Sequence, residues 1–171
     1  MPQSQLLLFR LCQHARNEDV LIPSVIRGKR VVEIGKEAFV DNRKIVRVTI
    51  PHGVVEIGER AFSSCWNLEE ILIPKGITEI RPYTFQYCNK LHRIVIPNGV
   101  KSIGDFSFFR CESLVDIAIP ASVAVIDKNA FMDRTIDFFY RPNRAFTIHC
   151  SRGSYAEQYA RKHKFRVEYT G

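Results

Sequence analysis

Apolar and polar positions recur along this chain with a period of 23 residues, and the period covers most of its length. Phenylalanine returns at five evenly spaced positions, and isoleucine returns in two further columns, the second of which is followed each time by proline. The phenylalanine column is Phe39, Phe62, Phe85, Phe108 and Phe131, and the isoleucine columns are Ile34, Ile57, Ile80, Ile103, Ile126 and Ile50, Ile73, Ile96, Ile119. A period of this length predicts a solenoid, because so small a unit cannot bury its apolar face alone.

Within each unit the pattern predicts one strand, a turn and a return of the chain. In residues 54–74, Leu68, Ile71 and Ile73 alternate with polar residues, which is typical of a short, half-buried strand. Proline then ends the strand, and we expect a turn with proline at its second position and glycine at its fourth. Residues 57–65 read as a tight bend and a short helical turn. Stacked copies would place like residues about 4.7–4.9 Å apart in a parallel sheet.

The second copy, Ile57 to Pro74, matches the pattern I-G-x-x-A-F-x-x-C-x-x-L-x-x-I-x-I-P at every specified position. The copies beginning at Ile34, Ile80 and Ile103 match with few changes, and Arg81-Pro82 is the main departure. Over roughly residues 20–169 the chain resembles the BspA-like subclass of bacterial leucine-rich repeats. The resemblance implies an α/β solenoid of about five coils with parallel strands on one face. It also implies a role in adhesion or recognition.

The two ends of the chain depart from the repeat and are expected to be caps. We divide the chain into an N-terminal cap at 1–30, leucine-rich repeats at 31–140 and a C-terminal cap at 141–171. At the N-terminal end, Phe9-x-x-Cys12 reads as a degenerate half-repeat that leads through residues 20–23 into the first strand, although residues 5–16 read equally well as a short capping helix. Residues 25–31 read as a small hairpin.

The C-terminal end carries a helix-start signal. Ser154-Tyr155-Ala156-Glu157 is a capping box, which predicts a helix to about Lys164. Short strands are expected on either side of it, at 146–149 and 165–169. This strand, helix and strand order is similar to the C-terminal cap of BspA-like arrays.

The formal net charge of +7 is concentrated at the ends of the chain. Residues 141–171 hold seven Arg or Lys against Glu157 and Glu168, and residues 1–30 are also basic, so the repeats between them are close to neutral. Polar ends keep a repeat stack soluble, although a basic end can also contact nucleic acid or another polyanion. The candidate residues for such a contact are Arg152, Arg161, Lys162, Lys164 and Arg166.

The outward side of the predicted strands is the best candidate for a binding surface. One outward column alternates in charge and begins near Asp19, and a neighbouring column is mostly apolar and begins at Leu21. The candidate contact residues are Arg47, Thr49, Glu70, Leu72, Arg93, Val95, Asp116 and Ala118. Opposite charges on neighbouring strands can pair and stabilise the register. An apolar strip beside such a ladder can accept a protein or an extended peptide.

Other conspicuous residues are best explained by packing. The phenylalanine column and the cysteine column of Cys65, Cys88 and Cys111 are expected to point inward, the thiols remaining reduced. The surroundings of Cys150 are left open by the sequence. Trp66, Tyr87 and Phe109 are expected on the outer edge of the bend, and Gly35, Gly58 and Gly104 are expected to serve turns.

Catalytic signals are weak. The five histidines are assigned to turns, bends and caps without a common column, and no nucleophile elbow or phosphate-binding glycine loop occurs. We therefore expect a non-enzymatic protein that needs neither cofactor nor metal. Its partner would be a protein, and two alternatives stay open. One is an intracellular scaffold or detached module of a larger protein, and the other is nucleic-acid or polyanion binding through the basic ends.

The compartment depends on whether the chain is complete. No apolar run approaches the ~20 residues of a membrane helix, so no membrane insertion is expected. Residues 1–20 lack a secretory apolar segment. A complete chain would stay in the cytoplasm, most simply as a monomer, whereas a chain lacking its export signal would act at the cell surface or be secreted.

Overall fold

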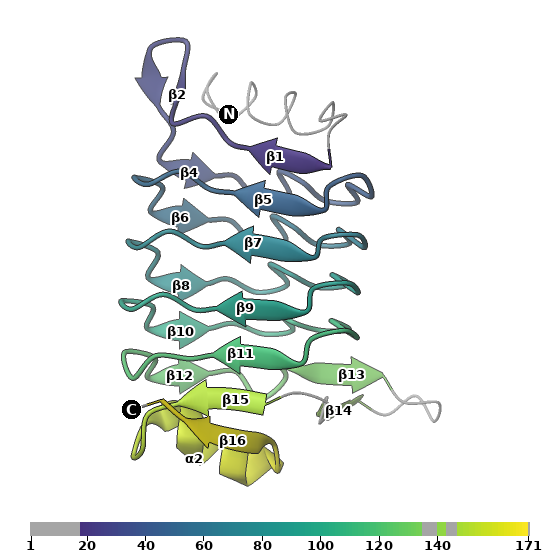
Figure 1. The fold of residues 1–171 in the computed structure, drawn as a ribbon, viewed down its shortest axis with the longest axis vertical. Coiled ribbons are helices and arrows are strands. Elements are labelled where there is room, and N and C mark those ends of the chain that lie inside the picture. The colour runs from purple at the N-terminus through teal and green to yellow at the C-terminus, as the bar shows by residue number, and fades with distance from the viewer. Residues whose placement is uncertain (1–17, 135–139, 143–146, 171) are drawn as a thin grey trace.

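The computed structural model describes residues 18–134, 140–142 and 147–170. These form a solenoid of about five coils, in which each coil contributes one strand to a front row and one shorter strand to a back row (Figure 1). The strands of the two rows run in opposite directions across the molecule. The half-repeat or capping helix expected at 5–16 lies outside the described residues.

The front row contains the strands that the alternating pattern predicts. These strands are β1 (Asp19–Leu21), β5 (Arg47–Thr49), β7 (Glu70–Leu72), β9 (Arg93–Val95), β11 (Asp116–Ala118), β15 (Thr147–Cys150) and β16 (Arg166–Tyr169). Equivalent residues stack in parallel register, so that Val48 lies beside Val20 on one side and Ile71 on the other. In β5, β7 and β9 the middle residue is buried and its two neighbours are exposed. The predicted half-buried strand is therefore confirmed.

The back row is absent from the sequence prediction. Its strands are β4 (Glu33–Ile34), β6 (Glu56–Ile57), β8 (Glu79–Ile80), β10 (Ser102–Ile103) and β12 (Val125–Ile126). Each ends on a buried isoleucine of the first isoleucine column. Two residues are too few to show an alternating pattern, and only pairing between coils makes them strands.

The bend after each back-row strand is a series of turns, so the expected short helical turn is wrong. Two positions in each of the first four bends have left-handed backbone angles, for example Arg60 with φ 57° and Ser64 with φ 61°. A right-handed helix cannot pass through such residues. The bends are held instead by hydrogen bonds within and between coils, as where Phe62 N donates to Thr84 O at 3.0 Å. In the part of the chain that the structure describes, α2 is the one α-helix.

The turns after β5 and β9 differ by one position from the prediction. Val54 N donates to Pro51 O, and Val100 N donates to Pro97 O, so proline is the first residue of the turn and glycine the third. Gly53 and Gly99 have φ of 102° and 107°, which only glycine adopts easily.

Gly58 and Gly104 begin turns, since each carbonyl accepts a hydrogen bond from the N–H three residues later, and they also allow close packing between coils. A Cβ on Gly58 would lie 2.5 Å from Lys36 N, and one on Gly104 would lie 2.7 Å from Pro82 N. Gly58 N also donates to Ile34 O at 2.8 Å. The backbones of successive coils therefore meet at these two glycines.

Both rows are interrupted at the same boundary between coils. Among the described strands, β6 and β8 do not form a ladder, and neither do β7 and β9, although β7 and β9 lie side by side (Figure 1). The interruption coincides with Arg81-Pro82, the departure from the repeat. A residue before proline is restricted in its backbone angles, and proline has no N–H to donate. One residue pair thus marks the place where the stack is least regular.

A continuous core fills the space between the two rows. The rings of the phenylalanine column stack through the whole array, and Phe85 lies between Phe62 and Phe108 at centroid distances of 5.8 and 5.4 Å. The thiols of Cys65, Cys88 and Cys111 are buried, and each donates to the carbonyl of the phenylalanine 26 residues earlier. The inward packing of both columns is confirmed.

Further elements lie toward the two ends of the described chain. Near the start, β2 (Val25–Ile26) and β3 (Lys29–Arg30) form an antiparallel hairpin. After the last repeat, β13 (Met132–Arg134) pairs with β14 (Tyr140–Pro142). Helix α2 (Tyr155–His163) then connects β15 to β16, which extend the front row. Cys150, which the sequence left open, is buried on β15.

Candidate functional site

The outward side of the front row carries two columns of exposed side chains. We call Arg47, Glu70, Arg93 and Asp116 the charged column, and Thr49, Leu72, Val95 and Ala118 the apolar column. The first residue of each of the strands β5, β7, β9 and β11 belongs to the charged column, and the last residue belongs to the apolar column. The middle residue of each strand anchors it in the core, so its two neighbours must face outward. Leu72 and Val95 are each 58% exposed. Exposed aliphatic side chains at adjacent strand positions form a small apolar patch.

An open groove of about 910 Å³ runs over this surface, centred on β7, β9 and β11. Six of the eight candidate contact residues line it: Arg47, Glu70, Leu72, Arg93, Val95 and Ala118. Thr49 and Asp116 do not. The rim adds residues that the sequence did not single out, among them Lys75, Asn98 and Ser151. Lys75 and Asn98 follow their strands in turns and stand 23 residues apart, in the same column as Ala121, so the repeat spacing could have identified them, whereas Ser151 follows β15 after the inserted segment.

The outer members of the charged column are paired with neighbours. Arg47 Nε lies 2.9 Å from Asp19 Oδ1, and its second contact to the same carboxylate is 3.3 Å long. The hydrogen bond and charge of Asp19 raise the pKa of Arg47. At the other side of the groove, Asp116 Oδ1 lies 2.8 Å from His149 Nε2.

The central members, Glu70 and Arg93, make no ion pair or side-chain hydrogen bond with any of the described residues. Arg47 lies opposite Glu70 in register but turns toward Asp19. The predicted pairing of charges along the whole column therefore holds only at its ends. Glu70 and Arg93 therefore place one acidic and one basic side chain on adjacent strands without an ion-pair partner among the described residues, and Glu69 and Lys75, which also line the groove, make no ion pair there either.

His149, which the sequence assigns to the C-terminal cap, also belongs to this surface. It lies on β15 beside Ala118, so it continues the apolar column by one strand. Its Nε2 faces Asp116, and its Nδ1 lies 3.4 Å from Glu168 Oε2. The interval from Ala118 to His149 is longer than the repeat, because the segment between β12 and β15 is inserted. His149 therefore does not follow Ala118 at the 23-residue spacing, and the repeat did not predict its place on this surface.

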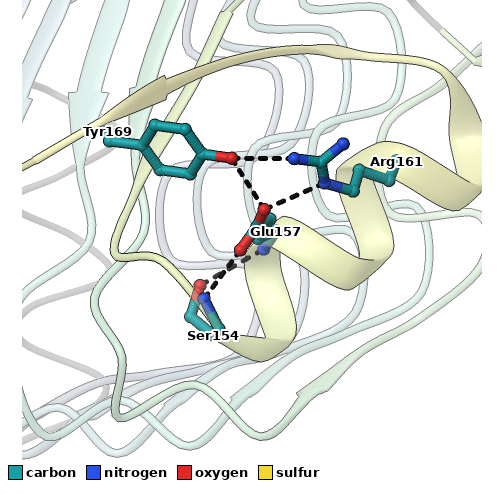
Figure 2. A network of polar contacts seen from close by, with 5 residues as sticks. Ser154, Glu157, Arg161 and Tyr169 are labelled. Carbon is teal, nitrogen blue, oxygen red and sulfur yellow. Dashed lines mark hydrogen bonds and ion pairs between the residues drawn. The ribbon is translucent and has the colours of Figure 1, made fainter.

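The basic C-terminal residues are only partly available for contact. Arg161 Nε donates to Glu157 Oε1 at 2.9 Å and its terminal nitrogen donates to the Tyr169 hydroxyl at 2.8 Å, as Figure 2 shows. The guanidinium carbon of Arg152 lies 4.1 Å from the centre of the Tyr169 ring. The remaining three candidates, Lys162, Lys164 and Arg166, are exposed or half-exposed on α2, its end and β16.

The same contacts join α2 to the last strand. Ser154 Oγ accepts from Glu157 N at 3.2 Å, so the helix begins where the capping box predicts (Figure 2). Glu157 Oε2 accepts from Gly153 N, one residue earlier than in the usual box, and Glu157 Oε1 accepts from Tyr169 Oη at 2.7 Å. The hydrogen bonds from Tyr169, Gly153 and Arg161 lower the pKa of Glu157 from 4.5 to about 2.

This network predicts an acid-dependent loss of stability. A carboxylate with a lowered folded-state pKa contributes stability above its unfolded value of 4.5, and that contribution disappears as the pH falls toward about 2. Melting temperatures followed by circular dichroism should show that Glu157→Gln is less stable than the unmodified chain at pH 6. The two should converge between pH 4.5 and 2. Tyr169→Phe, which removes one donor, should reduce the same difference. A gap that stays constant across this pH range would contradict the assignment.

Aromatic residues on the outer edge of the bend are not alike. Trp66 is exposed, with the Arg43 guanidinium carbon 4.7 Å from its ring centre. Phe109, expected at the same edge, is 4% exposed and makes edge-on contacts with Tyr87 and Phe106. A local aromatic cluster covers it, which the repeat register alone does not reveal.

The described residues also bear on metal binding and on membrane insertion. Within residues 18–134, 140–142 and 147–170, no three His, Cys, Asp or Glu side chains are grouped so that they could hold a metal ion. None of the described helical segments has the length and apolar character of a membrane span. The ion-pair contacts of His149 with described residues are to the carboxylates of Asp116 and Glu168.

Parallel short strands, inward-pointing repeat residues and an outward strand surface define a leucine-rich-repeat solenoid. The profile of the BspA type leucine rich repeat region matches residues 16–137 in six copies. The chain belongs to this BspA-type leucine-rich repeat family. Repeats of this class generally serve as structural modules or mediate protein interactions.

Solved structures of bacterial leucine-rich repeat proteins have the same fold. The leucine-rich repeat protein of T. pallidum is 35% identical with a TM-score of 0.70, covering 79% of this chain and 59% of that protein. A leucine-rich cell surface protein of Faecalibacterium prausnitzii is 30% identical with a TM-score of 0.68, covering 91% and 33%. A leucine-rich repeat protein of Bacteroides ovatus is 31% identical with a TM-score of 0.55, covering 77% and 39%.

The chain therefore corresponds to 59% of the T. pallidum protein and a third of the F. prausnitzii protein. No curated protein matches the chain.

Proposed function

We propose that this chain is a non-enzymatic recognition module that binds another protein through the groove on the front row of strands, in an adhesion role of the BspA type. The observation that carries the proposal is the groove itself. Six candidate contact residues line it, and its floor presents Leu72 and Val95 with more than half of each side chain exposed. Contiguous exposed apolar surface bordered by polar groups is typical of protein contact sites.

The proposal for a surface role draws on the F. prausnitzii relative, which is described as a cell surface protein. A scaffold inside the cell, or a module of a larger protein, would use the same groove. The surface role and the scaffold or module role differ in compartment and partner rather than in the contact surface.

Val95→Glu is expected to abolish partner capture without unfolding the chain. The carboxylate would stand in the apolar column, where a docked partner would have to desolvate it. Capture from extracts of host or neighbouring cells, quantified by mass spectrometry, should lose its specific proteins in Val95→Glu and in Leu72→Glu. Val125→Glu is the matched control, since Val125 is 55% exposed on the back row. A partner retained by both groove variants would contradict binding through this groove.

Salt separates this proposal from polyanion binding at the basic end. Binding to phosphate groups weakens steeply as salt rises, because counterions are released when lysine or arginine neutralises them. Nucleic acid captured only at low salt, and lost in Lys162→Ala/Lys164→Ala, would assign the function to the C-terminal end instead.

A further inference from the structure

We infer that the groove selects an extended peptide segment in which an apolar residue stands between two residues of opposite charge, of the form basic–apolar–acidic in either chain direction. This inference rests on the proposed binding function and specifies the chemistry of the partner. Four side chains carry it: Glu70 and Leu72 from β7, and Arg93 and Val95 from β9.

The charges that the fold leaves unpaired define the polar part of the site. Asp19 neutralises Arg47 and His149 faces Asp116, whereas neither Glu70 nor Arg93 has an ion-pair partner among the described residues. Their side chains therefore stay available to a ligand without breaking an existing ion pair. A ligand that neutralises both would carry one cation and one anion.

The position of the two columns fixes the order of these groups. Glu70 and Leu72 are two residues apart on one strand, so the charged and apolar columns are separated by about 6.6–6.8 Å. An extended peptide lying along the solenoid axis between the columns would point successive side chains alternately to either side. Its first and third side chains would face the charged column, and its second would lie on the apolar column.

The spacing along the axis is compatible with this arrangement. Glu70 and Arg93 stand on neighbouring strands, which lie about 5 Å apart, and alternate residues of an extended peptide lie about 6.6–6.8 Å apart. Long charged side chains readily span the difference of about 2 Å. The apolar residue of the peptide would then rest between Leu72 and Val95. Because the ladder between β7 and β9 is interrupted, the groove lies at the least regular boundary of the stack.

Other charged groups also line the groove. Glu69 and His92 directly precede β7 and β9, and Lys75 follows β7 in the turn. Glu69 and Lys75 make no ion pair with a described residue, but Glu70 and Arg93 are the charged residues that belong to the two neighbouring strands themselves, and the inference rests on that pair.

Selection from a phage-displayed library of random eight-residue peptides tests the inference. The unmodified chain should enrich the basic–apolar–acidic pattern at least tenfold over its frequency in the library. Glu70→Arg places two cations in the groove and should shift the selected pattern to acidic–apolar–acidic. Arg93→Glu places two anions there and should shift it to basic–apolar–basic. Glu79→Arg is the matched control, since it makes the same charge change on the exposed back-row strand β8 and should select as the unmodified chain does.

The outcomes distinguish this inference from the proposed function. In one outcome, the selected peptides bind the unmodified chain and fail to bind Leu72→Glu, but their charge pattern is the same for Glu70→Arg and Arg93→Glu. This outcome would overturn the inference and leave the groove as a binding site. If the selected peptides still bind the Leu72→Glu variant, the inference and the binding of peptides through the groove would both be overturned. The absence of any enriched peptide would overturn the inference, and the capture experiment with Val95→Glu would still decide the proposed function.

Discussion

Phe85→Ala is expected to lower the free energy of unfolding by about 3–5 kcal/mol, the range for deleting a fully buried phenylalanine side chain. Phe85 has no exposed surface and stacks between Phe62 and Phe108. Backbone hydrogen bonds from Phe62 N to Thr84 O and from Phe85 N to Ser107 O hold these coils at a set spacing, so the stack cannot collapse into the space left behind. Most of the cavity would remain, and its cost would add to the lost transfer free energy.

Urea unfolding followed by circular dichroism measures this loss. Trp66→Ala is a suitable control, because it removes a larger aromatic side chain that is 46% exposed. We expect that change to cost about 1 kcal/mol or less. If Phe85→Ala cost less than about 1 kcal/mol, the phenylalanine stack would not be the main element of the core.

Gly58→Ala is expected to cost about 1–3 kcal/mol, although it adds one methyl group at a position with an ordinary backbone conformation. The new Cβ would lie 2.5 Å from Lys36 N and 2.7 Å from Gly35 C, both backbone atoms of the neighbouring coil. A side chain could rotate away, but backbone can move only if one coil shifts against the next. That shift would strain the hydrogen bond from Gly58 N to Ile34 O.

Arg81→Ala is the control for this prediction, because Arg81 occupies the equivalent place one coil further on and already carries a Cβ. It removes only the exposed ion pair with Glu56, which is worth between zero and about 1 kcal/mol. Urea unfolding should therefore separate the two variants. Equal losses would show that Gly58 is not required for the close approach of the coils.

The main parts of the fold and of the candidate site could be predicted because they repeat. A residue type that returns every 23 positions reports a shared environment, so the buried phenylalanine and cysteine columns and the exposed columns of Arg47 to Asp116 and Thr49 to Ala118 follow from spacing alone. The features that were missed have no such signal. The back-row strands are only two residues long. The left-handed residues of the bends include Arg60 in one coil and Tyr83 in the next, and these two side chains share no preference for that conformation.

Within the site, spacing predicted which side chains face outward but not which of them are paired. The repeat places alternating charges along the front row, yet Arg47 turns to Asp19 and leaves Glu70 unpaired. His149 reaches Asp116 only because β15 continues the front row after an insertion. Side-chain orientation among several nearby charges depends on the three-dimensional contacts of each group, and a one-dimensional pattern does not contain them.

By itself, the sequence determined the repeat, the inward phenylalanine and cysteine columns, the front-row strands and the start of the last helix, since each depends on periodicity or on a local capping signal. Only the tertiary structure decided the back row, the interruption beside Arg81-Pro82, the burial of Phe109 and which charges of the front row are paired. These features arise from contacts between neighbouring coils. Their geometry depends on how closely two backbones approach, which the residue types of one coil do not specify.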